Sequence, residues 1–187
     1  LAARLSDTSV VNAGDGMHEH PTQALLDCLS LMQHFSERAG GIEGLRLAIV
    51  GDVRHSRVAR SNIWAHKLLG NEVRLVGPPT LVPAEFASPD FGGGQVRVCS
   101  DLVEGVRDAD VVMCLRMQLE RQDQNFVPTL QEYTNEFIVT EQLLARHAPR
   151  AVVMHPGPVN RGTEVQSTLI DGPRSLMSRQ VTNGVAV

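Results

Sequence analysis

The stretch LRLAIVGDVRHSRVARSNIWAHKLL, residues 45–69, decides the fold class. Its first six residues, 45–50, form a short β-branched apolar run, which predicts a buried strand. A polar loop follows, and residues 57–69 then repeat apolar side chains at helical spacing. A strand that leads through a short loop into a helix is the repeating unit of an α/β fold.

Four segments further along the chain have the same strand character, because each is short, apolar and bounded by Gly, Asp or Pro. They are residues 72–76, 95–99, 110–115 and 151–154. Helical patterns lie between them, at residues 101–109 and 140–147, and Thr140 is a typical helix cap. The alternation predicts an α/β domain over about residues 45–187, with a doubly wound, mostly parallel sheet flanked by helices.

The first 40 residues are a different element. Residues 9–12 could form one more strand, a glycine-rich loop follows, and a helix begins at Pro21, since proline suits the first helical turn. Apolar side chains recur through this helix at helical spacing, at Leu25, Leu29, Met32 and Phe35. We expect the segment to be the end of a neighbouring domain, and a chain that begins with Leu1 to be a processed product or a fragment.

Composition excludes several functional classes. The 187 residues leave room for one domain, or for one and a part. The 17 basic and 21 acidic residues give a net charge of −4, which argues against a nucleic-acid-binding surface, and no stretch has the apolar length of a membrane span. Cys28, Cys99 and Cys114 are far apart in apolar stretches, so we expect buried free thiols and a cytoplasmic location.

Four polar clusters fall where open α/β sheets bind ligands, outside the carboxyl ends of the strands. Three follow predicted strands and one precedes the first helix: residues 51–57, 116–121, 155–161 and 18–23. All but one of the 17 basic residues are arginine, the cation that binds carboxylate and phosphate through two hydrogen bonds. The clusters therefore predict a small anionic substrate that carries a carboxylate, with histidine and amide groups to polarise a carbonyl.

Two of these clusters indicate which chemical groups of the substrate they could bind. Arg116 and Gln118 are two residues apart, so in an extended segment they point to the same side and could share one carboxylate. Pro156 and Pro158 fix the path of a loop and leave carbonyl oxygens without local N–H partners, which suits recognition of an NH2 group. No activated nucleophile is evident, which favours direct transfer between two bound substrates.

The same loops allow other interpretations, which are weaker. Asp52 follows a strand and could be a phosphoacceptor, but aspartate in that position is more often a cap or turn residue. The loop lacks the G-x-G-x-x-G pattern of dinucleotide binding. His18 and His20 flank Glu19, but a third zinc ligand at useful spacing is missing. We expect neither a metal nor a cofactor.

Four motifs carry a family resemblance. They are NAGDGMHEHPTQALLD (12–27), VGDVRHSRVARS (50–61), LRMQLERQ (115–122) and MHPGPVNRGTEV (154–165). In this order they resemble the catalytic chain of the aspartate carbamoyltransferases over nearly the whole sequence. The ornithine carbamoyltransferases share the fold and an H-P-x-Q motif, but typically have H-C-L-P where this sequence has residues 155–158, HPGP.

The resemblance implies transfer of the carbamoyl group of carbamoyl phosphate to the amino group of L-aspartate, a step of de novo pyrimidine biosynthesis. His20 would hydrogen-bond the carbamoyl carbonyl oxygen, and Gln23 would bind the NH2 group. The remaining carbamoyl phosphate contacts would come from Pro156, Gly157 and Pro158. The aspartate contacts would come from Arg57, Arg116 and Gln118, with Glu120 supporting Arg116.

The resemblance also implies a domain organisation. Residues 1–40 would be the end of the carbamoyl phosphate-binding domain with the interdomain helix, and residues 45–187 the aspartate-binding domain without its final C-terminal helix. The phosphate-binding loop would lie upstream of Leu1, so the chain alone would be inactive and would expose Leu25, Leu29 and Met32. A homotrimer and an association with dihydroorotase are further expectations. The alternatives are a catalytically silent ligand-binding or assembly module of this fold, and an ornithine carbamoyltransferase.

Overall fold

Five parallel strands form a single sheet in the computed structural model, which describes residues 4–89, 91, 94–117 and 130–187. In chain order they are β1 Arg46–Val50, β2 Glu72–Val76, β3 Val96–Cys99, β4 Val111–Cys114 and β5 Val152–Met154. Their order across the sheet is β3-β2-β1-β4-β5. Each lies within an apolar run predicted to be a strand, and the predicted parallel α/β sheet is confirmed.

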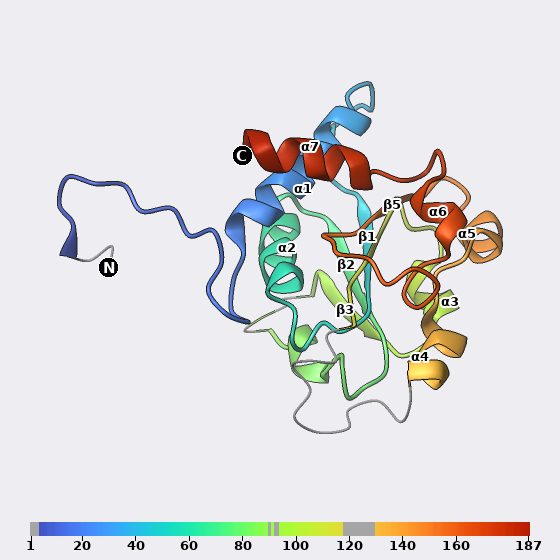
Figure 1. Cartoon of the computed structure of the whole chain (residues 1–187). Coiled ribbons are helices and arrows are strands. Elements are labelled where there is room, and N and C mark those ends of the chain that lie inside the picture. Colours follow the sequence, from blue (N-terminus) through green and yellow to red (C-terminus); the bar gives the residue numbers. More distant parts are fainter. Residues whose placement is uncertain (1–3, 90, 92–93, 118–129) are drawn as a thin grey trace.

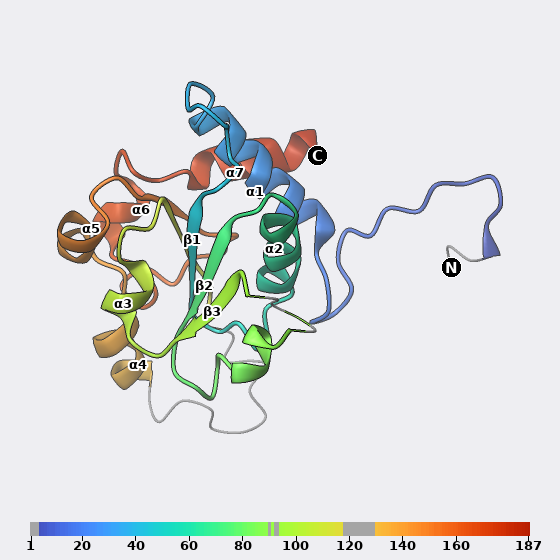
Figure 2. The ribbon, with the colours of Figure 1, turned by 180° about the vertical axis from the view of Figure 1, so that it is seen from behind.

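Helices cover both faces of the sheet, as Figures 1 and 2 show. On one face lie α1 Pro21–His34 and α2 Arg57–Leu68, with α7 Met177–Ala186 against α1. On the other lie α3 Leu102–Val106, α4 Leu130–Phe137, α5 Glu141–His147 and α6 Ser167–Ile170. A short 3-10 helix, η2 Ala84–Ala87, packs beside β3.

Strand β1 shows why the sheet is buried on both sides. Its side chains alternate between the faces, so Leu47 and Ile49 join the core under α1 and α2, whereas Ala48 and Val50 join the core under α3 to α6. All four are at most 1% exposed. An unbroken apolar run is therefore what a central parallel strand requires.

The predicted helices are also confirmed, with boundaries within a few residues. Thr140 caps α5, because its hydroxyl accepts a hydrogen bond from the backbone N–H of Leu143 at 3.2 Å. Helices α4, α6 and α7 and the short η2 had no counterpart in the sequence prediction.

The strand expected at residues 9–12 is wrong. Residues 9–12 are exposed and form no strand in the described structure, where the segment before α1 extends away from the helices and the sheet (Figures 1 and 2). An apolar pair such as Val10 and Val11 is not enough, because a strand needs a neighbour for its backbone hydrogen bonds.

Helix α1 buries a polar face and exposes part of its apolar face. Leu25 is 60% and Met32 55% exposed, as predicted, whereas Leu29 is half-buried. The buried side of the helix includes Gln23, Asp27 and Ser30. Polar side chains in such a position require partners, and these come from α2 and α7.

The three cysteines are free thiols, with Cys99 and Cys114 buried, as predicted, and Cys28 half-buried. Burial raises the pKa of the Cys28 thiol to about 11, so this thiol stays protonated at neutral pH. No helix in the described part of the chain has the length and apolar character needed to cross a bilayer.

Candidate active site

The sheet has a switch point between β1 and β4. From β1 the chain continues to β2 and β3 on one side, and then crosses to β4 and β5 on the other. The loops that follow β1 and β4 therefore diverge, and ligands of open α/β sheets bind in the crevice between them. A cavity of about 200 Å³ lies there, lined by His20, Gln23, Ser56, Arg57, Val58, Leu115, Arg116, Pro156, Gly157 and Pro158.

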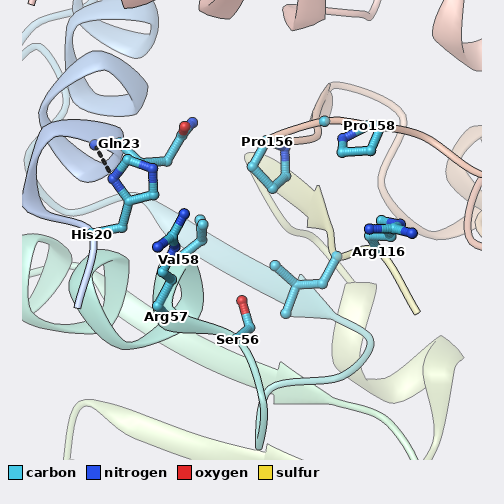
Figure 3. A pocket seen from close by; sticks show the side chains of 10 residues that line it. His20, Gln23, Ser56, Arg57, Val58, Arg116, Pro156 and Pro158 are labelled. Carbon is cyan, nitrogen blue, oxygen red and sulfur yellow. Dashed lines mark hydrogen bonds between the residues drawn. The ribbon is translucent and has the colours of Figure 1, made fainter. Parts of the chain in front are cut away.

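Figure 3 shows the cavity with its polar groups on two sides. His20, Gln23 and Arg57 come from α1 and α2, and they face Arg116 and the 156–158 loop across the opening. The structure thus brings together seven of the nine residues predicted for the site. The other two, Gln118 and Glu120, lie outside the described residues.

Three lining residues were not singled out from the sequence: Ser56, Val58 and Leu115. Each is a direct neighbour of a predicted arginine. The signal that could have found Leu115 is its place directly after β4, and that for Ser56 and Val58 is their place at the N-terminus of α2, since both positions border the crevice.

His20 presents a hydrogen-bond donor to the cavity. Its Nδ1 caps α1 by accepting from the backbone N–H of Gln23 at 3.3 Å, and Thr22 Oγ1 lies at the same distance from Nδ1. Partial burial, and then the nearby Arg57 cation, lower the pKa of His20, so the ring is neutral at pH 7. With Nδ1 assigned as the acceptor, the proton of the neutral ring is on Nε2.

The backbone of His20 is fixed to α2. Its N–H donates to the hydroxyl oxygen of Ser61 at 2.9 Å, and that hydroxyl in turn donates to the carboxylate of Glu19. The loop before α1 and the helix that carries Arg57 therefore keep a constant separation.

Arg57 is the first residue of α2, whose N-terminus is capped by Ser56 accepting from the backbone N–H of Ala59 at 3.1 Å. Its guanidinium passes very close to Gly14. A Cβ atom at Gly14 would lie 2.7 Å from Nη1 of Arg57, and the φ of Gly14 is +137°. The backbone angle therefore favours glycine here, and a side chain at this position would displace the Arg57 guanidinium.

Asp52 has the turn role that its position favours. It is fully buried and accepts from the backbone N–H of His55 at 3.2 Å, and His55 Nδ1 lies 2.9 Å from the same carboxylate. These contacts hold the loop between β1 and α2 in one shape. The phosphoacceptor alternative would need an accessible carboxylate, which this burial does not provide.

Across the cavity, the loop that carries Arg116 is held through its neighbour Met117. The backbone N–H of Met117 donates to Oε1 of Glu164 at 3.0 Å, and Asn160 Nδ2 donates to the same oxygen at 2.8 Å. Arg116 itself is half-buried at the end of β4. The loops after β4 and β5 are thus joined at the cavity edge.

His155 organises the backbone of the proline loop. Its Nδ1 accepts from the backbone N–H of Gly157 at 2.9 Å, and its own N–H donates to Oε1 of Gln180 at 3.0 Å. Burial, and then the neighbouring Arg116, lower the pKa of His155 to about 4. The ring is therefore neutral and holds the backbone of the loop.

The described lining combines two guanidinium groups, a neutral imidazole donor and carbonyl acceptors from an amide and a proline loop. Such a set can bind carboxylates, polarise a carbonyl and recognise an NH2 group. Among the described residues, no group of three or more His, Cys, Asp or Glu side chains is arranged to hold a metal ion.

Comparison by sequence gives a matching family model and matching curated relatives. The family model described as "Aspartate/ornithine carbamoyltransferase, Asp/Orn binding domain" matches residues 43–187. The aspartate carbamoyltransferase catalytic subunit of Pelotomaculum thermopropionicum is 51% identical over all 187 residues, and that of Gluconobacter oxydans 52%. The chain spans 58% and 57% of the length of these two curated relatives.

Solved structures agree in fold. The ornithine carbamoyltransferase of Gloeobacter violaceus matches with a TM-score of 0.78 at 26% identity, over 98% of this chain and 60% of that one. An aspartate transcarbamoylase of Trypanosoma cruzi, in complex with N-(phosphonacetyl)-L-aspartic acid, matches with a TM-score of 0.72 at 26% identity, over 98% and 56%. By its sequence and its fold, the chain belongs to the aspartate/ornithine carbamoyltransferase family.

Proposed function

We propose that the chain is the larger part of an aspartate carbamoyltransferase catalytic subunit, which transfers the carbamoyl group of carbamoyl phosphate to L-aspartate. The observation that carries the proposal is the pairing of Arg57 and Arg116 with the His20 donor and the Gln23 acceptor around one cavity. Relatives near 50% identity that are named for aspartate support this choice of acceptor over ornithine.

His20 has the role of oxyanion stabiliser in the proposed reaction. The aspartate amine attacks the carbamoyl carbon and forms the new C–N bond, and the carbonyl electrons move onto oxygen. When the carbonyl forms again, the bond to the phosphate oxygen breaks, the phosphate leaves and the amine loses a proton. A donor such as Nε2–H of His20, aimed at the carbonyl oxygen, stabilises the charge that develops in this step.

The NH2 group of carbamoyl phosphate has acceptors on both sides of the cavity. The side-chain oxygen of Gln23 lies on one side, and the backbone carbonyls of Pro156 and Gly157 lie in the loop on the other. Arg57 and Arg116 then bind the two carboxylates of aspartate, each through a forked guanidinium. Gln118 and Glu120 complete the proposed aspartate site.

The proposal includes the predicted organisation of the subunit. Residues 1–40 end a carbamoyl phosphate domain and residues 45–187 form the aspartate domain. Homotrimeric assembly, association with dihydroorotase and a cytoplasmic location remain predictions from the family resemblance. Leu25 and Met32 of α1 are exposed, which supports a neighbouring domain that covers them in the full-length subunit.

The substrate that accepts the carbamoyl group distinguishes this proposal from the alternative of an ornithine carbamoyltransferase. With carbamoyl phosphate as donor, the full-length subunit is expected to form N-carbamoyl-L-aspartate, and at least 100 times less citrulline from L-ornithine at equal concentration. The reason is that ornithine would place a side-chain ammonium among guanidinium groups. Product formation measured by chromatography, against the reaction without enzyme, tests this. Preferential citrulline formation, or no transfer to either acceptor, would contradict the proposal.

A further inference from the structure

A buried polar cluster joins α1, α2 and α7 behind the cavity. Its centre is Asp27, which is 0% exposed. Oδ1 of Asp27 accepts from Gln23 Nε2 at 2.9 Å and from Gln180 Nε2 at 2.8 Å, and Oδ2 accepts from Asn62 Nδ2 at 2.9 Å. Buried carboxylates usually pair with a cation, yet the ion pairs between described residues do not include Asp27.

The charge state of Asp27 determines which way the amides face. Burial raises the pKa of Asp27 to about 6, and the hydrogen bonds from Gln180, Asn62 and Gln23 oppose that rise. The side chain is therefore a carboxylate at pH 8, with acceptors and no donor. Each of the three amides must turn its NH2 group toward Asp27, and its oxygen away.

For Gln23 this orientation has a consequence in the cavity. Its NH2 group is held by Asp27, so its Oε1 atom is directed away from Asp27, and the side chain ends at the cavity beside His20 (Figure 3). No hydrogen bond between described residues uses Oε1 of Gln23. Asp27 is thus the group that keeps an oxygen, rather than an NH2 group, available to a bound substrate.

The same carboxylate reaches the opposite wall through α7. Gln180 donates to Asp27, and its Oε1 accepts from the backbone N–H of His155, which precedes Pro156 and Gly157. One buried side chain therefore orients the amide on one side of the cavity and is linked through Gln180, by two hydrogen bonds, to the residue that precedes Pro156 on the other.

We propose that Asp27 is a positioning residue that sets donor specificity, because it makes Gln23 present only an acceptor and so selects a carbamoyl over an acetyl group. The inference rests on the proposed function. A carbamoyl NH2 donates to Gln23, whereas a methyl group in its place leaves the oxygen unpaired. An unpaired buried acceptor corresponds to about a 5- to 150-fold loss.

The test compares carbamoyl phosphate with acetyl phosphate in the full-length subunit, with L-aspartate as acceptor. The readout is the ratio of kcat/KM for the two donors. The unchanged protein is expected to favour carbamoyl phosphate about 10- to 100-fold. Asp27→Leu keeps the number of side-chain atoms but removes the hydrogen-bond acceptor, so the Gln23 amide can turn. The ratio is then expected to fall at least fivefold, and the KM of aspartate to stay within twofold.

Two control variants separate the acceptor from other effects. Asp27→Asn keeps an oxygen for Gln23 and Gln180. Its new NH2 group takes the place of Oδ2 and donates to Oδ1 of Asn62 when the Asn62 amide turns over, and this oxygen is buried with no partner among the described residues. The ratio is expected to stay within twofold. Ser30→Ala removes a hydrogen bond from Asn183 at the same interface of α1 and α7, 2.9 Å long, and should not change the ratio either.

The outcomes distinguish this inference from the proposed function. If the unchanged protein transfers no carbamoyl group to aspartate, the proposed function fails. If it prefers carbamoyl phosphate and Asp27→Leu keeps that preference, or if Asp27→Asn loses as much of it as Asp27→Leu, the inference is overturned. Where Asp27→Leu does not fold, Asp27→Ser serves instead, since its hydroxyl is too short to hold Gln23 and the same fivefold loss is expected.

Discussion

Assayed by itself, the 187-residue chain is expected to form no measurable N-carbamoyl-L-aspartate from carbamoyl phosphate and L-aspartate. The two substrates together bring about four negative charges, two of them on the phosphate. Among the described cavity residues the cations are Arg57 and Arg116, which we assign to aspartate, and His20 is neutral. The phosphate therefore needs cationic groups beyond these.

Without a bound phosphate the donor is not positioned for attack. Holding two reactants in the correct geometry can lower a barrier by about 7 to 11 kcal/mol, and a site that anchors only one substrate loses most of this. The measurement is product formation by the chain alone, by the full-length subunit at equal concentration, and by the chain mixed with the part of the full-length subunit that precedes these residues. Activity of the chain alone near that of the full-length subunit would contradict the claim.

Arg116→Lys in the full-length subunit is expected to raise the KM of aspartate about 10- to 150-fold. Lysine keeps the positive charge but loses the fork that binds a carboxylate at two points. Charge-assisted hydrogen bonds contribute about 1.5 to 3 kcal/mol each, which corresponds to this range. The KM of carbamoyl phosphate should change less than twofold, because its proposed contacts are His20, Gln23 and the proline loop.

Steady-state kinetics with each substrate varied in turn checks this prediction. A suitable control is Arg97→Lys, because the side chain of Arg97 is 71% exposed on β3, away from the cavity lining. Arg97→Lys should leave the KM of aspartate and the KM of carbamoyl phosphate unchanged. If Arg116→Lys leaves the aspartate constant unchanged, Arg116 does not belong to the aspartate site.

The sheet was predictable because its sequence signal is local. A central parallel strand is buried on both faces, so β1 and β4 read as continuous apolar runs, and the turn residues around them mark their ends. Helix α2 was predictable for a related reason, since its apolar repeat and its Ser56 cap lie within one segment.

The elements that were missed or misjudged depend on distant contacts. Helix α7 exposes apolar side chains, with Val181 at 75% and Val185 at 90%, whereas its buried side carries Gln180 and Asn183, which hydrogen-bond to Asp27 and Ser30 of α1. Conversely, residues 9–12 have strand-like composition and no neighbour to pair with. Neither fact is visible in a short window of sequence.

The residues of the site also fall into those that have a local sequence signal and those that do not. Arg116 and the proline loop could be placed because each follows a strand end closely, and Arg57 because it begins the helix after the loop that follows β1. Asp27 could not, because an amphipathic helix is expected to bury its apolar side, and two of the three partners of Asp27 are 35 and 153 residues away in sequence. The positions proposed for Gln118 and Glu120 stay predictions, since both lie outside the described residues.

We expect one cavity to bind both substrates side by side, and a crystal structure of the full-length subunit with N-(phosphonacetyl)-L-aspartic acid would show whether it does. This molecule joins an aspartate to a phosphonate through a carbonyl group, and so represents both substrates at once. We predict its two carboxylates against Arg57 and Arg116, and its carbonyl oxygen within hydrogen-bond distance of Nε2 of His20. A ligand bound elsewhere, or one whose carboxylates contact neither arginine, would contradict the account.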